Sequence, residues 1–258
     1  MGILNVTPDS FSDGGRYNDR ERAVDHGLKL VSDGADMLDI GGESTRPGAD
    51  PVDEAEEIRR TLPVIEALRR ETGIPISIDT MKPGVARAAI GAGANIWNDV
   101  NALRVPGALE TAAGLECGVV LMHMQGEPRT MQAAPAYDDV VAEVEACLLS
   151  RADAAIAAGI APEKIALDPG IGFGKTLDHN LALLRGTNRL ASHGFPVLVG
   201  ASRKRFIAAA DPCQDDGNRL GGSIYAALYA AAQGAAIVRV HDVRETAQAI
   251  ALRLAIEG

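Results

Sequence analysis

Acidic, amide and basic side chains stand at the ends of several short apolar runs of this sequence. Asp79, Asn98 and Asp168 each close such a run, and Lys204 comes shortly after another. Carboxylate and amide oxygens accept hydrogen bonds, whereas a lysine ammonium only donates them. A flat heterocycle with an aminopyrimidinone edge matches this set, because its N–H groups pair side by side with a carboxylate and its carbonyl oxygen accepts from a lysine.

A second group of side chains suits a phosphate. Ser202, Arg203 and Lys204 follow one apolar run, and Arg239 with His241 lies at the end of the last run. In barrels of parallel strands the last two strands commonly bind phosphate, assisted by helix N-termini. We therefore expect the ligand to carry a phosphate on this side.

The segment NVTPDSFSDGG near the start of the chain contains the oxygen ligands Asn5, Asp9 and Asp13. Amide and carboxylate oxygens suit Mg²⁺, which is usually held jointly with substrate phosphates. The same segment has one aromatic residue, Phe11, and ends in two glycines. Its composition fits a loop that closes over a substrate, and equally a plain surface turn.

Other residues near the ends of apolar runs have less specific interpretations. Asp39 and Asp99 are explained as helix N-caps, and His123 as a structural histidine, because no second histidine lies at helical spacing from it. Met122 and Met124 flank His123, and we expect only one of them to line a site.

The elements that must position these groups alternate along the chain. Apolar runs typical of buried parallel strands span residues 1–6, 36–40, 74–79, 95–99, 118–123, 164–168, 195–200 and 236–240. Between them lie stretches with helical spacing; one begins with Asp50 as N-cap, and Pro63 should kink or split it. The count of βα units over 258 residues predicts an α/β fold, a single (β/α)₈ TIM barrel over residues 1–258. A doubly wound open sheet has the same alternation and is the competing architecture.

Composition narrows the choice of partners and compartment. The net charge of −10 argues against nucleic acid and membrane surfaces as partners. Cys117, Cys147 and Cys213 lie far apart without a CxxC pair, which fits a reducing cytoplasm. Residues 220–238 are uncharged and long enough to cross a bilayer, but their glycines and alanines favour a packed helix, a turn and a buried strand.

Several strings of the sequence together resemble one enzyme family. They are MGILNVTPDSFSDGG, DIGGESTRPGA, SIDT, LMHMQGEPRTMQ, LDPGIGFGKT, GASRKRF and IVRVHDV, in this order from Met1 to about Val243. In these strings and their order the chain resembles the dihydropteroate synthases. The resemblance implies a barrel enzyme, a transferase of folate biosynthesis and sulfonamide target that joins 6-hydroxymethyl-7,8-dihydropterin pyrophosphate to p-aminobenzoate. It also implies a dissociative mechanism, Mg²⁺ and a homodimer.

The resemblance assigns roles residue by residue. For the pterin it implies Asp79, Asn98, Met122, Asp168, Gly172, Phe173 and Lys204. For the pyrophosphate it implies Asn5, Arg46, Arg239 and His241, with Asn5 and Asp13 acting through Mg²⁺. For the p-aminobenzoate pocket it implies Phe11, Thr45, Arg46, Pro47 and Ser202. The residues expected to act on the reacting groups, by electrostatics alone, are Arg239, His241, Lys204 and Asp79.

Two other functions share parts of this pattern. A methyltetrahydrofolate-type methyltransferase would have the same pterin-binding barrel but no pyrophosphate to hold, so Arg239 and His241 argue against it. A catalytically silent pterin-binding paralogue would keep the same motifs. It would bind a pterin in a titration and take up no p-aminobenzoate.

Overall fold

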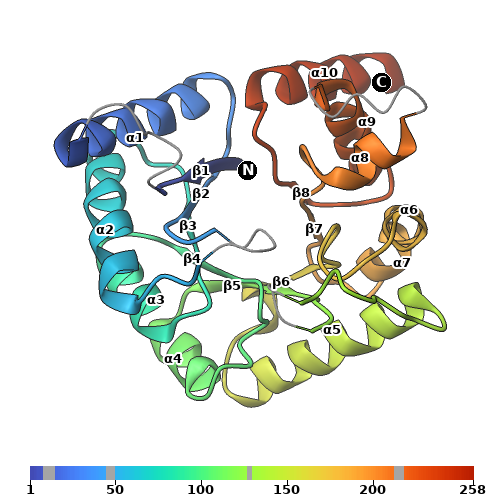
Figure 1. The fold of residues 1–258 in the computed structure, drawn as a ribbon, viewed down its shortest axis with the longest axis horizontal. Coiled ribbons are helices and arrows are strands. Elements are labelled where there is room, and N and C mark those ends of the chain that lie inside the picture. Colours follow the sequence, from blue (N-terminus) through green and yellow to red (C-terminus); the bar gives the residue numbers. More distant parts are fainter. Residues whose placement is uncertain (8–14, 45–49, 127–129, 212–217) are drawn as a thin grey trace.

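The computed structural model describes residues 1–7, 15–44, 50–126, 130–211 and 218–258. Helices surround an inner set of strands when the molecule is viewed down its shortest axis (Figure 1). The strands are β1 (Gly2–Asn5), β2 (Leu38–Gly41), β3 (Ile76–Asp79), β4 (Ile96–Asp99), β5 (Gly118–Met122), β6 (Ile165–Asp168), β7 (Leu198–Val199) and β8 (Ile237–Val238). The helices are α1 (Gly15–Ser32), α2 (Glu54–Glu71), α3 (Pro83–Gly91), α4 (Ala108–Leu115), α5 (Val140–Ala157), the short η2 (Pro162–Lys164), α6 (Leu177–Arg185), α7 (Thr187–Ala191), α8 (Arg205–Ala210), α9 (Leu220–Ala232) and α10 (Val243–Glu257).

The strands form a closed ring. β1 to β6 pair in chain order, all parallel, and β7 pairs in parallel with β8. Isolated bridges between Leu167 and Val197 and between Gly2 and Val240 join the two sheets at both edges. The amide of Ile3 donates to the carbonyl of Val240 at 3.0 Å, so the last strand meets the first. The predicted barrel is confirmed, and an open doubly wound sheet is wrong because its first and last strands would not pair.

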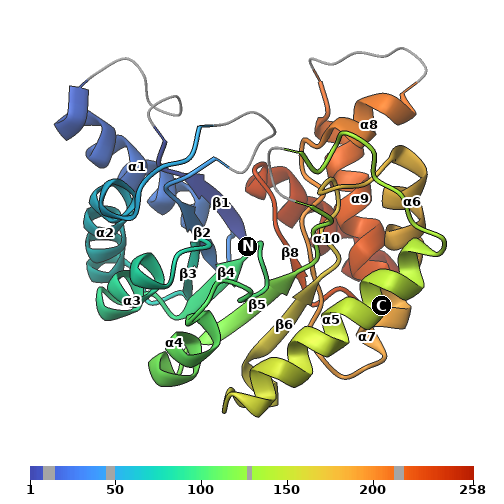
Figure 2. The ribbon, with the colours of Figure 1, turned by 60° about the horizontal axis from the view of Figure 1, so that its bottom comes forward.

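Strand side chains alternate between two apolar layers, as the period of two requires. Leu38, Ile40 and Trp97 pack in the large core that also contains helix residues such as Leu68. A separate cluster, made of strand residues and Met1, lies inside the ring; its buried members are Met1, Val120, Ala166 and Leu198. Figure 2 shows the strands enclosed by the helices.

Helix α2 differs from the sequence expectation in two ways. Its N-cap is Asp53, whose Oδ1 accepts from the amide of Glu56 at 2.8 Å, and not Asp50. Pro63 lies inside one continuous helix, so of the expected kink or split the split is wrong, and the kink stays a prediction. The neighbouring Ile65 is fully buried in the core, and this packing outweighs the hydrogen bond that a proline cannot donate.

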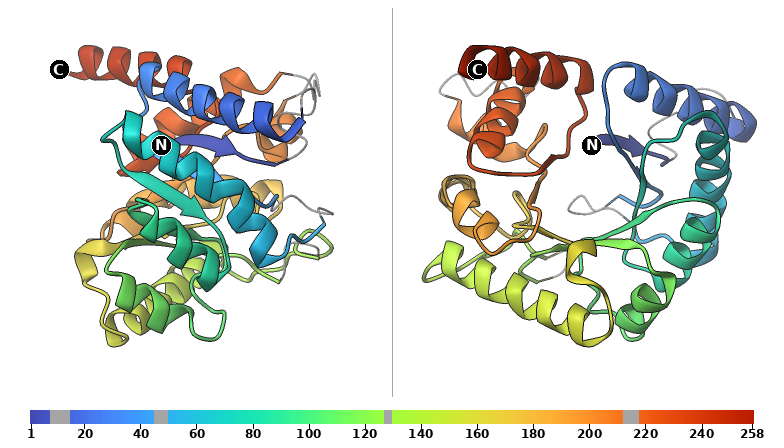
Figure 3. Two further views of the ribbon diagram at one scale, coloured as in Figure 1. Left: turned by 90° about the vertical axis from the view of Figure 1, so that its left-hand side faces the viewer. Right: turned by 180° about the vertical axis from the view of Figure 1, so that it is seen from behind.

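The uncharged stretch 220–238 forms α9, a turn and β8, as expected from its small residues. Within the ranges that the structure describes, no helix is both long and apolar enough to cross a membrane. Seen from behind, the N-terminus lies inside the ring of helices and the C-terminus lies at the outer end of α10 (Figure 3).

Candidate functional site

The carboxyl ends of the strands, here called the rim, carry a hydrogen-bonded cluster of charged and amide groups. Arg239 follows β8, and its Nε donates to Asp39 Oδ2 at 2.5 Å while its Nη2 donates to Asp79 Oδ2 at 2.8 Å. Asn98 on β4 donates through Nδ2 to the same Asp39 oxygen at 3.1 Å. Four strands therefore hold one arginine and one amide in fixed positions around two acids.

Burial governs the electrostatics of this cluster. Burial raises the pKa of Asp79 to about 7; the positive charge of Arg239 opposes this rise, and the negative charge of Asp39 adds to it. Burial lowers the pKa of Arg239, but the two carboxylates outweigh it and raise that pKa above its ordinary value. The guanidinium thus stays charged, whereas Asp79 is poised to change its protonation state near neutral pH.

Lys204 reaches the rim from the loop after β7. Its ammonium donates to the carbonyl of Ile171 and lies 4.5 Å from the centroid of the Phe173 ring. Burial lowers the pKa of Lys204 to about 8, although the charge of Asp168 favours the protonated form. Gly172 has φ +82°, and a Cβ at this position would lie 2.8 Å from Lys204 Cδ. Only glycine leaves room for the lysine stem here.

An apolar cluster lies beside these polar groups. Met122, Met124, Met131 and Val100 are buried together, and the Phe173 ring packs against them. Met122 and Met124 share this cluster, so the expectation that only one of them lines a site is wrong. Residues two apart on an extended segment point to the same side, which is the physical reason.

The phosphate side of the rim joins β7 and β8. Ser202 Oγ lies 3.0 Å from His241 Nδ1 and accepts from the His241 amide at 3.2 Å. Asn5, at the end of β1, lies on the Asp79 side of the rim: a Cβ at Gly41 would be 3.8 Å from Asn5 Oδ1 and 3.8 Å from Asp79 Oδ2. The amide oxygen of Asn5 and the carboxylate of Asp79 therefore flank one position of the rim.

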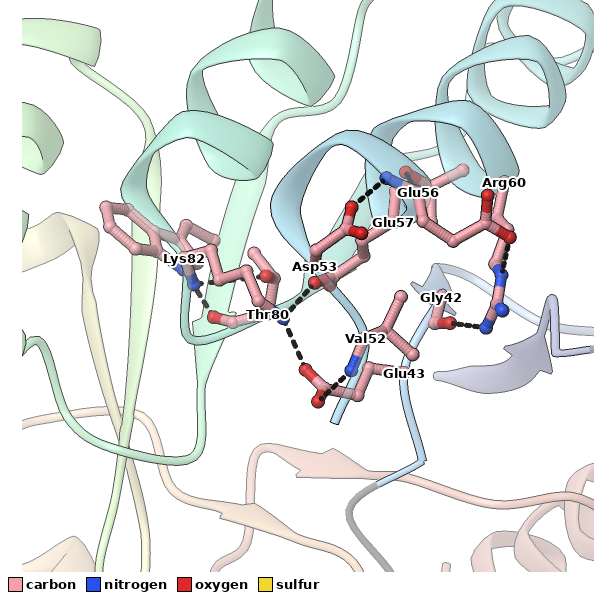
Figure 4. A network of polar contacts seen from close by, with 11 residues as sticks. Gly42, Glu43, Val52, Asp53, Glu56, Glu57, Arg60, Thr80 and Lys82 are labelled. Carbon is pink, nitrogen blue, oxygen red and sulfur yellow. Dashed lines mark hydrogen bonds and ion pairs between the residues drawn. The ribbon is translucent and has the colours of Figure 1, made fainter. Parts of the chain in front are cut away.

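A polar network fixes the loops that follow β2 and β3 (Figure 4). Lys82 Nζ lies 2.5 Å from Glu43 Oε2 and 2.6 Å from Oε2 of the fully buried Glu57 on α2. Glu43 Oε1 accepts from the amide of Val52 at 3.0 Å, so one carboxylate binds both Lys82 and the segment that leads into α2. The strand end that carries Asp79 is thereby held against α2.

Comparison with known proteins decides which family this geometry belongs to. The family model described as pterin binding enzyme matches residues 1–241. A dihydropteroate synthase of Escherichia coli strain K12 is 50% identical over 253 residues, which cover 97% of this chain and 88% of that protein. The chain belongs to the dihydropteroate synthase family. It is a transferase that joins 6-hydroxymethyl-7,8-dihydropterin pyrophosphate to p-aminobenzoate to give 7,8-dihydropteroate and pyrophosphate.

Solved structures of other synthases agree with this assignment. A dihydropteroate synthase of Xanthomonas albilineans with 4-aminobenzoic acid superposes with a TM-score of 0.94 at 52% identity, covering 100% of this chain and 92% of that one. The same organism's enzyme in complex with 7,8-dihydropteroate gives a TM-score of 0.91 at 50% identity, covering 100% and 93% of the two chains. A Yersinia pestis synthase with a sulfonamide drug complex is 47% identical, with a TM-score of 0.91, and covers 100% and 93%.

The structure of this synthase brings most of the predicted residues together. Those that lie at the rim or against its apolar cluster are Asn5, Asp79, Asn98, Met122, Asp168, Gly172, Phe173, Ser202, Lys204, Arg239 and His241. The remaining predictions, Phe11, Asp13, Thr45, Arg46 and Pro47, lie outside the described residues. The contacts of all these residues with substrates stay predictions.

Two buried residues of the synthase were missed as site residues. Asp39 is fully buried and bonds to Arg239 and Asn98, so its interpretation as an N-cap is wrong. The alternation of side chains along β2 could have revealed the role of Asp39. Residues two apart point to the same side, so Asp39 shares a strand face with Gly41 at the carboxyl end of the strand. Lys175 is also buried, and no spacing in the sequence marks it. Asp99 accepts the amides of Asn101 and Leu103, so it stabilises a turn and is not an N-cap either.

Proposed function

We propose that this synthase holds the pterin ring in a slot formed by Met122, Asp168, Gly172, Phe173 and Lys204, facing Asp79 and Asn98. One observation supports this most directly: carboxylates, an amide and an ammonium converge beside an apolar surface that fits a flat ring. Asp168 is oriented for this role because its Oδ1 already accepts from the amide of Gly170 at 2.7 Å. Its other oxygen and the Lys204 ammonium supply the acceptor and donor that an aminopyrimidinone edge requires.

The pyrophosphate would lie toward Arg239, His241 and Asn5. Arg239 donates through Nε and Nη2 and leaves Nη1 without a partner among the described residues, so one donor edge can turn to a phosphate. The His241 ring is held in place by Ser202, whose Oγ lies 3.0 Å from its Nδ1. Arg46, the fourth predicted ligand, lies outside the described residues.

The residues at the rim fit Mg²⁺ as the metal. Among the described residues no three histidine, cysteine or acidic side chains form a metal-binding group. Asn5 nevertheless presents an amide oxygen at the rim, near the Asp79 carboxylate. One or two hard oxygen ligands are enough for Mg²⁺ that is completed by substrate phosphates and water, with Asp13 as the expected second ligand. Bound there, the ion would neutralise the charge of the departing pyrophosphate.

No protein nucleophile is needed if the bond from the exocyclic methylene to the pyrophosphate breaks first. Arg239 and His241 then stabilise the negative charge that leaves, and Asp79 and Asp168 stabilise the positive charge that develops on the dihydropterin. All four groups are fixed by contacts or by burial before substrate arrives. Preorganised charges of this kind act without reorganisation during the reaction.

The p-aminobenzoate would enter beside Ser202, near the start of α8. Ser202 is buried, and its hydroxyl is bonded to His241. The predicted carboxylate contact therefore lies on the same side of the rim as His241, and the amine at the other end of the p-aminobenzoate ring would face the exocyclic methylene of the pterin. Phe11, Thr45 and Pro47 complete the predicted pocket outside the described residues.

We further propose a single-domain homodimer that works in the cytoplasm. Tyr225 on α9 is 69% exposed, and on α10 Leu252, Leu254 and Ile256 are 61%, 64% and 76% exposed. These helices pack together, with Arg253 Nη1 donating to the Leu228 carbonyl at 3.2 Å. A second copy would cover these apolar side chains. Sedimentation of wild type and Leu254→Glu tests this, and a wild type that sediments as a monomer refutes it.

The deciding experiment is product formation followed chromatographically from both substrates, with Mg²⁺ and with excess chelator. We expect dihydropteroate only with metal, and in Arg239→Ala a turnover lower by about 10²-fold, as for loss of an oxyanion donor. Arg189→Ala is the matched control, because Arg189 pairs instead with Glu145 at the surface and belongs to none of the predicted binding groups. Wild-type turnover in Arg239→Ala contradicts the role given to this arginine.

A further inference from the structure

Lys175 is a buried cation that the proposed mechanism does not use. It lies in the loop between β6 and α6, and its side chain is almost fully covered. Its ammonium lies 2.9 Å from the Phe173 carbonyl, 3.3 Å from the His123 carbonyl and 3.1 Å from His123 Nδ1. An ammonium has three N–H donors, and here three acceptors surround it.

The protonation of His123 fits this arrangement. Burial, together with the charges of Lys175 and Arg104, lowers the pKa of His123 to about 3, so the ring is neutral. A neutral ring whose Nδ1 faces an ammonium accepts at Nδ1 and carries its proton on Nε2. His123 is therefore an acceptor for Lys175, in keeping with the structural role expected of it.

The contact ties two rim loops together. His123 follows β5, and a Cβ at Gly170 in the facing loop would lie 1.9 Å from the His123 carbonyl. A Cβ at Gly174 would lie 2.7 Å from the carbonyl of Gln125. The two backbones thus approach as closely as glycine allows, and Lys175 bonds across the contact.

Lys175 has hydrogen-bond acceptors but no carboxylate partner among the described residues. Burial lowers its pKa to about 7, while the charge of Asp168 raises it and that of Lys204 lowers it. A buried cation hydrogen-bonded only to neutral acceptors is costly, because Asp168 acts on it without a direct contact and offsets only part of its desolvation. A lysine at the surface would not lose this desolvation free energy. The burial of Lys175 therefore points to a role at the neighbouring pterin slot.

We propose that Lys175 is a positioning residue for the pterin slot: by bonding to His123 and to the Phe173 carbonyl, it holds the loop of residues 170–176 where Phe173 and Gly172 face the ring. The inference rests on the proposed pterin slot. Lys175 itself does not touch the substrate and acts through Phe173.

Lys175→Met tests this, because methionine keeps the length of the side chain and removes every donor. We expect the dissociation constant for 6-hydroxymethylpterin, measured by titration calorimetry, to rise about tenfold, as when a binding group loses its support. The KM for p-aminobenzoate should stay unchanged. The control is Lys164→Met at the other end of β6, where Lys164 Nζ also donates to a backbone carbonyl, that of Glu116, at 2.5 Å.

A double-mutant cycle separates positioning from general stability. If Lys175 acts through Phe173, Lys175→Met adds no further loss of pterin binding in a Phe173→Ala background. Equal losses in both backgrounds, or wild-type affinity in a folded Lys175→Met, overturn the proposal. If thermal unfolding shows that Lys175→Met does not fold, His123→Ala removes the one side-chain acceptor of Lys175 and keeps its two backbone acceptors, and it is judged by the same criteria with a smaller expected loss. A wild-type protein that binds no pterin refutes the proposed pterin slot, which distinguishes that failure from a failure of the role proposed for Lys175.

Discussion

Replacing Asp39 by asparagine tests whether the acid beneath the rim sets the charge balance of Arg239 and Asp79. Asp39 Oδ2 accepts from both Arg239 Nε and Asn98 Nδ2, so an asparagine of the same shape can keep both bonds through its one oxygen. The substitution removes the negative charge and places an NH2 group where the buried Oδ1 of Asp39 has no hydrogen-bond partner. Ser77→Ala is the matched control, because Ser77 is paired with Asp39 in the β2–β3 register and is equally buried.

Two effects follow from the structure. Arg239 stays charged in Asp39→Asn, so its hydrogen bond is kept but loses the opposite charge, which we take as about half of the roughly 1.5–3 kcal/mol that hydrogen bonds to charged groups contribute. The loss of about 1 to 1.5 kcal/mol at Arg239 corresponds to about a tenfold fall in kcat/KM. In addition, the charge of Asp39 raises the pKa of Asp79, which is about 7, so its removal lets Asp79 ionise at lower pH.

Steady-state kinetics across pH measure both effects. We expect the acidic limb of kcat/KM, which reports ionisation of the free enzyme, to move below its wild-type position in Asp39→Asn. On the plateau, kcat/KM should be about tenfold lower. Ser77→Ala should match the wild type in both respects. A plateau within twofold of wild type, or an acidic limb that moves upward, refutes the argument.

Further predictions concern Lys204, Gly172 and Glu116. The affinity for 6-hydroxymethylpterin, measured by calorimetry, should fall as pH rises through about 8, because Lys204 then loses the proton it donates; a constant affinity up to pH about 10, where an ordinary lysine deprotonates, contradicts this. Gly172→Ala places a Cβ 2.8 Å from Lys204 Cδ at φ +82°, which costs about 1–2 kcal/mol and should weaken pterin binding about tenfold in the same titration. Glu116→Gly, at an exposed left-handed position with φ 52° after α4, should raise the free energy of unfolding in urea by about 0.5 kcal/mol, and a lower midpoint would contradict it.

The barrel and the line of rim residues could be predicted because they depend on local patterns. Each apolar run is a buried strand, and a polar residue at its end must lie at the carboxyl edge of the sheet. The sequence alone therefore predicted correctly that Asp79, Asn98 and Asp168 lie at the carboxyl ends of their strands. The first residue of α2 could not be predicted, because Asp50 and Asp53 are both suitable N-cap residues. The packing of the helix selects Asp53.

The partners of the buried charges could not be predicted. Asp39 contacts Arg239 across 200 positions of the chain, and Lys175 contacts His123 across 52. No local pattern encodes such distances, since the same residue types also occur as N-caps or surface lysines. For Asp39 the alternation along β2 held a usable signal, whereas the burial of Lys175 depends on how closely two glycine-rich loops approach.

The closure of the ring by its last strand has a consequence for synthesis on the ribosome. Strands β1 to β6 can pair one after another as they emerge, but the open edge of β1 finds no partner until Val240 has been made. Until then Asp39 and Asp79 are acids without the arginine that neutralises them. A nascent chain that stops before β8 thus combines unpaired strand edges with unpaired acids, which is the state that chaperones bind and that aggregates most readily. Synthesis of the last strand therefore completes the polar cluster of the rim and removes the risk of aggregation in the same step.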